Sequence, residues 1–523
     1  MELRKKISVI ALLAVAISVL AVPARRDGHI MTAPDGTEKL VFMHGNEDFH
    51  YLTDENGVWL DENTLAPMSG EKKANRLAVK REKDIRRAVQ QTGADRLLAP
   101  KGPVILVNFS DESFTHTLDE MTAWVTGEDY HVGGSAGSIR EYFYDNSFGQ
   151  YDLQLDVYGP VTVSQGYAYY GQNRGNVDGA DMHPGEMVIE ACRAADAMVD
   201  FSQYDYNNDG EVDWVVIVYA GKGEADSYIA NTIWPHQHQL YSSAIQLDGK
   251  RINRYCCTNE IDGYNPGGAL AGIGVFVHEF SHIMGLPDLY TTNHTDHKTL
   301  GMWDIMDYGC YNDFPPMYSA YERWWMGWLE PTLLHQQAAN ISLGELSNTQ
   351  QAYYITANGD SIANILSPSP SVFYMLENRQ QSSWDTYLPG HGMLITKINW
   401  SYSRWTGNAV NNSSTDMGVD ILEADGLAPE WDGNMPGNGY HGKQGDTYPS
   451  GANSFTQLSG YQLTDITETN GLITLKVNGG TATEIIETEE DNYPARKILR
   501  NGQILILRGN NTYTLLGHEN HQL

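Results

Sequence analysis

The chain has 523 residues, in which 66 acidic side chains outnumber 34 basic ones, for a formal charge of −32. A surface this acidic repels phosphate backbones, which argues against a nucleic-acid-binding protein. A hydrophobic content of 41% with 19% charged residues excludes a disordered protein and indicates a folded chain long enough for several domains.

The first 24 residues have the pattern of a secretory signal peptide. Basic residues at positions 4 to 6 precede an uncharged run of 16 residues, from Ile7 to Val22. Val22 and Ala24 are the small residues expected at −3 and −1 of a cut after Ala24. The run is short for a membrane anchor and Arg25 follows at once, so export is the favoured interpretation. We therefore expect residues 1–24 to be removed and the product to be secreted, without a membrane span.

Residues 25–99 are expected to form a separate N-terminal region. They contain short apolar runs and a turn at 54–57. From Glu71 to Lys101, ten basic residues stand against four acidic ones. This pattern favours an exposed, cleavable joint that is attracted to an acidic partner domain. A solvated helix and linker is the alternative.

Residues 100–335 combine buried strands with helices. Runs rich in β-branched residues at 103–109 and 214–219 predict buried strands, and 187–199 predicts a helix. This alternation predicts an α/β (α+β) fold class. Four cysteines are too few for a disulfide scaffold, and their pairing is left open: Cys192, Cys256, Cys257 and Cys310.

A loop with regularly spaced oxygen ligands follows the predicted helix. Its carboxylates and amide match the first part of a calcium-binding loop, with Gly210 at the sixth position. Position 12 is Val216 rather than Glu, so the loop is not an EF-hand. We expect it to bind Ca²⁺, the alternative being a metal-free turn. The candidate ligands are Asp205, Asn207, Asp209, Glu211 and Asp213.

The motif His278-Glu279-Phe280-Ser281-His282 predicts a catalytic zinc site. His278 and His282 lie one helical turn apart on one face, so both imidazoles can reach one ion. Glu279 can take a proton from a metal-bound water as general base. Gly285 is suited to end the helix in a left-handed turn, which would return Asp288 as the third ligand. A helix with two satisfied histidines is the alternative, but its apolar flanks would make a buried cluster without metal costly.

Two further features lie near this motif. Met306 follows Asp288 by 18 residues, like the methionine turn under the metal of metzincin proteases. Tyr308 could offer its hydroxyl to the oxyanion that forms when water attacks a carbonyl. Four other histidines could bind metal but lack the spacing of Asp288: His236, His238, His294 and His297.

The remainder of the chain is predicted to be rich in strands. Residues 336–482 contain short strand-like runs at 372–376 and 393–398 among Gly, Asn and Ser. Residues 483–523 comprise an acidic linker and a small β unit.

The chain resembles the M6, or immune inhibitor A-like, family of secreted metalloendopeptidases. The resemblance runs from about 100 to 450 and rests on residues 278–288, 137–143, 147–151, 205–221, 376–380, 388–395 and 445–449. It implies a zymogen with a metzincin-like catalytic domain, zinc on His278, His282 and Asp288, and Glu279 as general base. The tail at 497–517 is similar to C-terminal sorting units of Bacteroidetes, which the type IX secretion machinery reads. A structural hairpin is the alternative for this tail.

Together these features predict five parts: a signal peptide (1–24), a propeptide (25–99), a zinc protease catalytic domain (100–335), a β-rich C-terminal part (336–482) and a linker with a sorting-like unit (483–523). We expect an endopeptidase that acts on extracellular polypeptides. The alternatives are a surface binding protein on a protease scaffold and a zinc amidase that acts on a cell-wall or glycoprotein bond. Residues 25–99 hold no cysteine, so a carboxylate, a carbonyl or steric cover would maintain latency, with Asp48, Asp54 and Glu55 as candidates.

Overall fold

The computed structural model describes residues 20–25, 27–47, 49–77, 101–132, 135–174, 180–265, 267–293, 295, 297–311, 314–427, 441–480, 496–500, 503–508 and 511–514. Several predicted features lie outside these residues: most of the signal peptide, the basic joint from 78 to 100, the linker at 481–495, Asp48 and His294. No helix among the described residues is long and apolar enough to cross a membrane.

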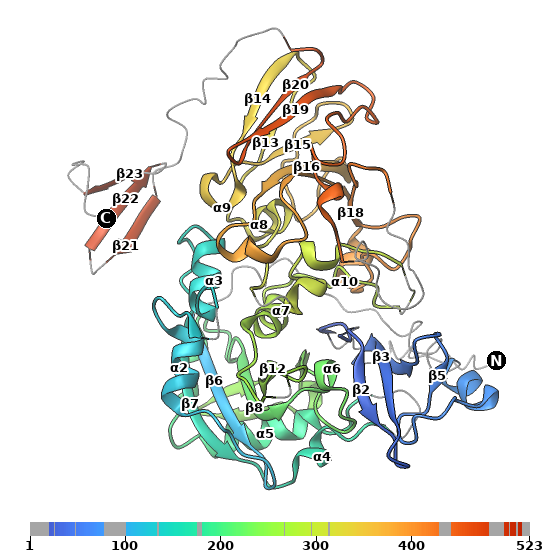
Figure 1. The fold of residues 1–523 in the computed structure, drawn as a ribbon. Helices are drawn as coiled ribbons and strands as arrows, with labels where there is room; N and C mark the ends of the chain where they lie inside the picture. The colour runs from blue at the N-terminus through green and yellow to red at the C-terminus, as the bar shows by residue number, and fades with distance from the viewer. Residues whose placement is uncertain are drawn as a thin grey trace, which may run out of the picture.

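An antiparallel sheet of four strands forms the N-terminal region, in the order β2-β3-β4-β5. Its core contains Val41, Met43 and Leu52, which are buried. In Figure 1 this sheet, in blue, lies beside α6 (Glu224–Ser227) of the next region. The strands are β2 (His29–Thr32), β3 (Glu38–Asn46), β4 (Phe49–Thr53) and β5 (Trp59–Leu60).

A second sheet, of six strands, forms the centre of the next region, in the order β1-β9-β12-β8-β6-β7. β12, β8, β6 and β7 run parallel, whereas β9 is antiparallel to β12 and β1 is antiparallel to β9. The strands predicted at 103–109 and 214–219 form β6 and β8. The bounds are β1 (Leu20–Ala21), β6 (Lys101–Asn108), β7 (Gln154–Thr162), β8 (Val215–Lys222), β9 (His236–Gln239) and β12 (Arg254–Ile261).

Helices cover both faces of this sheet, because alternate strand residues point to opposite sides. Val216 and Val218 of β8 belong to one core, with α2 (Leu118–Thr126), α3 (Ile139–Asn146) and α7 (Ile273–Ile283). Ile217 and Tyr219 belong to the other core, with α5 (Pro184–Ala195). The result is a mixed α/β domain. Its smaller elements are α4 (Tyr167–Tyr170), β10 (Ile245–Leu247) and β11 (Lys250–Ile252).

Two details differ from, or add to, the sequence predictions. The helix expected over 187–199 occupies Pro184–Ala195, because Pro184 takes the first helical turn, where its missing N–H is no loss. All four cysteines are buried free thiols. Cys256 and Cys257 lie in opposite cores of the sheet, so neither can reach the other.

The C-terminal region is built on two sheets that share one core, with Ile355, Leu376 and Leu475 among its buried residues. The first has the order β13-β15-β16-β17-β18 and the second β14-β20-β19. Figure 1 shows α7 between the central sheet and this region. The strands are β13 (Thr332–Leu333), β14 (Ala339–Leu343), β15 (Tyr353–Thr356), β16 (Val372–Arg379), β17 (Gly392–Asn399), β18 (Val419–Ile421), β19 (Leu463–Thr469) and β20 (Leu472–Val477).

Three short helices belong to the same part of the chain: α8 (Ala320–Met326), α9 (Leu346–Thr349) and α10 (Tyr402–Thr406). The tail forms an antiparallel sheet of its own, in the order β21-β22-β23. Its strands are β21 (Arg496–Arg500), β22 (Gln503–Arg508) and β23 (Asn511–Thr514).

Candidate active site

The helix α7 carries the histidine motif, and every one of its residues is buried. Gly285 directly follows the end of the helix and has φ +97°, the left-handed conformation that glycine adopts without strain. Its amide donates to the His282 carbonyl at 3.0 Å. The chain reverses at this point, and Asp288 returns toward the helix as the spacing predicts.

Three side chains converge at one point. His278 Nε2 and His282 Nε2 each lie 3.1 Å from Asp288 Oδ1, and the two Nε2 atoms lie 3.1 Å from each other. All three residues are buried. Among the described residues, this is the one cluster of three or more His, Cys, Asp or Glu whose ligand atoms all lie within 4.8 Å of one another.

The surroundings of this triad suit a metal ion. His278 Nδ1 donates to the Ile305 carbonyl and His282 Nδ1 to the Leu286 carbonyl, each at 2.7 Å. These bonds fix the proton on Nδ1 and leave Nε2 as the ligand atom, which is the arrangement typical of metal-binding histidines. Two imidazole nitrogens and a carboxylate oxygen are ligands that zinc accepts in catalytic sites.

Asn408, from the C-terminal region, orients the third ligand. Its side-chain Oδ1 accepts from the Asp288 amide at 2.7 Å, and its Nδ2 donates to Asp288 Oδ2. Asn408 is 120 residues away in sequence, and no sequence pattern identified it. The β-rich region therefore contributes directly to the centre.

Glu279 is buried beside the triad. Burial, and then the nearby Asp288 charge, raise the pKa of this carboxyl well above its usual value. Its Oε1 accepts a hydrogen bond from the Val22 amide at 2.7 Å. Glu279 therefore faces the segment of chain that runs past the triad.

That segment is residues 20–25, which begin with the short strand β1 (Leu20–Ala21) and continue without regular secondary structure to Arg25. We call the residues that contact this segment the groove. Leu20 and Ala21 pair antiparallel with Gln237 and His236 of β9. Farther along, the Arg25 amide donates to the Ala225 carbonyl at 2.8 Å. The segment is thus held by its backbone, as peptides are when they add a strand to a sheet edge.

Five consecutive carbonyls of this segment, from Ala21 to Arg25, each accept a hydrogen bond from an aromatic side chain. The donors in chain order are Tyr290 to Ala21, Trp234 to Val22 at 2.9 Å, Tyr311 to Pro23 at 2.6 Å, Tyr308 to Ala24 at 2.7 Å and Tyr228 to Arg25. Backbone contacts of this kind do not depend on side-chain identity, so the groove is suited to bind extended polypeptide.

The two tyrosines nearest the triad have different places in the groove. Tyr308 bonds the Ala24 carbonyl, two residues beyond Val22. Tyr290 bonds the Ala21 carbonyl, directly before Val22, and its ring is stacked on His278 at 6.4 Å between centroids. Sequence reasoning missed Tyr290, although it stands only two residues after Asp288. Met306 is fully buried, and its carbonyl accepts from the Leu289 amide at 2.9 Å.

The loop at 205–213 does not gather its oxygens around one point. Asp205 accepts from Lys250 Nζ at 2.6 Å and from two loop amides, those of Asp209 and Gly210. Glu211 pairs with Arg251. The remaining candidate ligands bond one another or loop amides. Calcium binding at this loop stays a prediction.

Of the other histidines considered from sequence, the three that the structure describes do not join the triad. His236 bonds the Trp234 carbonyl at 2.7 Å and the Tyr255 hydroxyl at 2.9 Å. His297 bonds the Asn411 carbonyl at 2.9 Å. His238 packs against Tyr241. The structure therefore selects His278, His282 and Asp288 among the described candidates.

Comparisons with known proteins agree with this geometry. Residues 96–316 match the family model "Immune inhibitor A peptidase M6, catalytic domain", a segment that contains the central sheet from β6 to β12, α7 and the triad. Immune inhibitor A of Bacillus thuringiensis subsp. alesti is 25% identical over 249 residues, covering 39% of this chain and 36% of that protein. The pre-pro-metalloprotease PrtV of Vibrio cholerae serotype O1 is 30% identical over 194 residues, covering 33% and 21%. The chain thus aligns with about a third or less of each relative.

Proposed function

We propose that this protein is a secreted, zinc-dependent endopeptidase made as a zymogen. The observation that carries the proposal is the arrangement of the triad and Glu279 beside a groove that holds extended backbone. The similarity of residues 96–316 to a peptidase catalytic domain supports it. The Vibrio relative is described as a pre-pro-metalloprotease, a name that indicates synthesis with a leader and a pro-segment.

In this proposal His278, His282 and Asp288 hold zinc, which when bound polarises a carbonyl and acidifies a water. Glu279 takes the water proton and passes it to the leaving nitrogen. The Val22 nitrogen, 2.7 Å from Glu279 Oε1, marks the place of that leaving nitrogen. A substrate's scissile bond would therefore lie where the bond between Ala21 and Val22 lies.

The two tyrosines receive separate roles. We predicted Tyr308 as the donor to the oxyanion. In the groove, however, it is Tyr290 that donates to the carbonyl before the leaving nitrogen, whereas Tyr308 holds a carbonyl farther along. We therefore propose Tyr290 as the main oxyanion donor and Tyr308 as a contact that holds the substrate backbone. We keep Met306, which is buried and whose carbonyl accepts from the amide of Leu289, as the proposed apolar floor under the centre.

From sequence we expected any steric cover to come from residues 25–99; the contacts of the segment 20–25 lead us to propose that it also covers the groove in the uncut chain. Ala21, Val22 and Ala24 are fully buried in the groove, so no substrate can bind while they remain. A signal cut after Ala24 would remove this cover. A cut after Ala21 would leave Val22 as the first residue, with its amino group against Glu279. Sequencing the amino terminus of the secreted protein distinguishes these two products.

The deciding experiment measures hydrolysis of denatured casein by the processed protein and by Glu279→Ala. Loss of the general base should lower the rate at least ~10²-fold. Glu330→Ala removes an exposed glutamate of the same size and serves as the matched control. A zinc chelator should abolish activity, and added zinc should restore it. Undiminished hydrolysis by Glu279→Ala would refute the proposal; a wild-type protein that binds zinc but hydrolyses no polypeptide would favour the binding-protein or amidase alternatives.

A further inference from the structure

The side chain of Arg25 is surrounded mainly by residues of the catalytic region. Its guanidinium carbon is 4.0 Å from the centre of the Tyr264 ring and 5.5 Å from that of Tyr311. The side chain is only 18% exposed, although arginine is normally a surface residue. Planar stacking on tyrosine faces favours a guanidinium over the compact ammonium of lysine.

Two acids of the catalytic region, Asp226 and Asp262, lie near enough to act on Arg25 through their charge. Burial lowers the pKa of Arg25, but Asp27, Asp226 and Asp262 more than offset that effect. Asp226 is 6% exposed, and its Oδ1 has no hydrogen-bond partner among the described residues. Its Oδ2 accepts from the Gly263 amide at 2.8 Å, which fixes the carboxylate. Asp27, which bonds Arg25 Nε at 3.0 Å, belongs to the N-terminal region and would leave with it.

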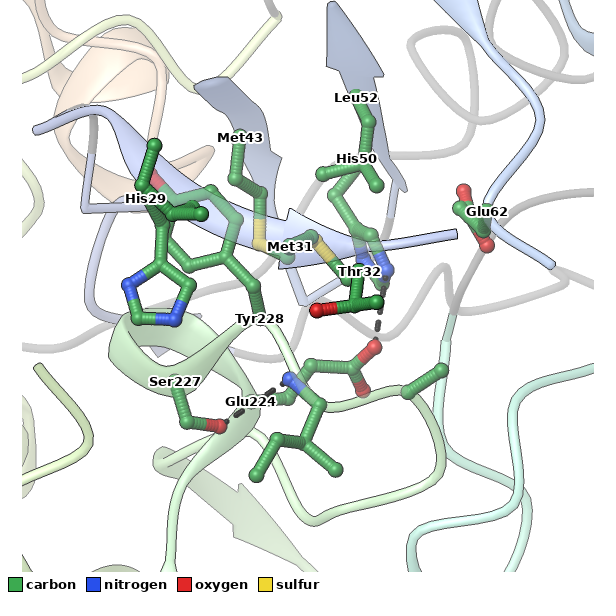
Figure 2. A pocket seen from close by; sticks show the side chains of 13 residues that line it. His29, Met31, Thr32, Met43, His50, Leu52, Glu62, Glu224, Ser227 and Tyr228 are labelled. Atoms are coloured by element: carbon green, nitrogen blue, oxygen red, sulfur yellow. Dashed lines mark hydrogen bonds and ion pairs between the residues drawn. The ribbon is translucent and has the colours of Figure 1, made fainter. Parts of the chain in front are cut away.

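The helix that carries Asp226, α6, also meets a titratable side chain of the N-terminal region, His50. Figure 2 shows His50, from β4, pointing at Glu224 of α6, with His29 against Tyr228 at the other side of a cavity of about 350 Å³. His50 and Glu224 form a buried ion pair at 3.2 Å. Burial lowers the pKa of His50, but the Glu224 charge, the hydrogen bond to Glu224 and the Glu62 charge together more than offset this, so the pKa is raised. α6 thus presents acidic side chains to cations that occupy the groove or its edge.

We propose that Asp226, Asp262, Tyr264 and Tyr311 form a guanidinium subsite of the groove. The subsite binds an arginine four residues after the scissile bond of a polypeptide substrate, the position that Arg25 takes relative to the bond between Ala21 and Val22. This proposal rests on the proposed endopeptidase function. It assigns the enzyme a class of substrate: extended segments with a basic residue on the carboxyl side of the cut.

The first test uses quenched fluorescent peptides that reproduce residues 20–25, with Arg, Lys, Ala or Glu at the last position. With Arg we expect kcat/KM about tenfold above Ala, with Lys between them and Glu lowest. Asp262→Asn and Asp226→Asn should bring the Arg-to-Ala ratio of kcat/KM to within about twofold, mainly through a lower rate on the Arg peptide. Asp360→Asn, an exposed aspartate of the C-terminal region, is the matched control and should keep the tenfold ratio.

The second test needs no catalysis. In the intact chain, verified by mass to retain residues 20–25, hydrogen exchange of the Arg25 amide reports how firmly the segment is held. Arg25→Ala should speed this exchange about tenfold, Arg25→Lys less, and Asp262→Asn by a similar factor. Because both changes remove the same charge interaction, the double variant should exchange no faster than either single one.

The outcomes separate the two proposals. Two results would overturn the guanidinium subsite and leave the endopeptidase standing. One is independent, additive effects of Arg25→Ala and Asp262→Asn on hydrogen exchange. The other is equal hydrolysis of the Arg and Ala peptides by an enzyme that needs zinc and Glu279. Coupled exchange in a protein that hydrolyses nothing would refute the endopeptidase, and with it the substrate preference, and would leave only a docking contact. Asp262, which is partly exposed, keeps the test valid if Asp226→Asn fails to fold.

Discussion

Two segments of this chain carry metal-binding patterns, and the structure treats them differently. On α7 and the turn that follows, His278, His282 and Asp288 converge with their ligand atoms 3.1 Å apart. In the loop at 205–213, oxygen-bearing side chains spaced two residues apart turn toward loop amides and toward basic side chains of β11. Spacing alone therefore predicts which residues are near one another, but not whether a cation is needed there.

The nature of the neighbouring groups accounts for the difference. Asp205 and Glu211 already face Lys250 and Arg251, so their charge is compensated without metal. Asp288, by contrast, is fully buried, and the ion pairs that it makes among the described residues are with the two histidines. Asp288 is a buried carboxylate, and both neighbouring imidazoles point Nε2 toward it. A cation at this point would bind all three ligand atoms and compensate the buried charge.

The largest effect that this comparison predicts concerns the third ligand. Asp288→Ala should lower zinc affinity by more than the 10- to 100-fold that removal of an outer partner typically causes. Zinc content, measured by elemental analysis, should fall from one per chain toward zero, and hydrolysis should vanish with it. Asp205→Ala is the matched variant in the loop and should leave zinc content unchanged. If both variants retain zinc, the triad is not the metal centre.

The next effect separates the two tyrosines. Tyr290→Phe should lower kcat about 10²-fold with little change in KM, because an oxyanion donor acts mainly in the transition state. Tyr308→Phe should raise KM and change kcat less, because its carbonyl lies away from the cut. Steady-state kinetics on one peptide, with zinc content as control, measure both. The reverse pattern would restore Tyr308 as the oxyanion donor.

Whether a part of the fold or of the site can be predicted from the sequence depends on how far apart along the chain its residues lie. Short sequence patterns predict β6, β8 and α7. The two strands are runs of β-branched residues, and the helix has two histidines four residues apart with Gly285 after them. Asn408 is not, because it meets Asp288 only after 120 residues of chain have folded back. Tyr290 stands beside the motif, but a single tyrosine next to a metal ligand is no pattern.

The segment 20–25 shows a different limit. Its apolar residues end a run that has the composition of a signal peptide, and we predicted a cut inside it. The same residues in the structure lie in a groove lined by aromatic side chains. Hydrophobicity favours transfer out of water in both cases and does not distinguish a translocation signal from a buried strand.

A smaller effect should appear in the pH dependence of substrate choice. Burial raises the pKa of Asp226 to about 7, with the Gly263 amide and Arg25 opposing and the Asp262 charge adding to the rise. Asp226 is therefore mostly neutral at pH 6 and charged at pH 8, and the charged form binds a guanidinium better. The Arg-to-Ala ratio of kcat/KM should rise several-fold between pH 6 and pH 8. Asp226→Asn should flatten the profile; a ratio that falls with pH would contradict this role for Asp226.

The smallest effect tests the loop. If Lys250 takes the place of a cation at Asp205, Lys250→Met should free the carboxylate, and the loop should then bind Ca²⁺ more tightly than in the wild type. Saturating calcium at about a hundred times Kd would add ~2.7 kcal/mol to stability, a shift of a few degrees in Tm. Thermal melting with and without calcium measures this, and Asp209→Asn in the same background should reduce the shift. An unchanged Tm in Lys250→Met would mean that the loop is held by hydrogen bonds and ion pairs alone, so that its calcium-like spacing reflects only the demands of a tight turn.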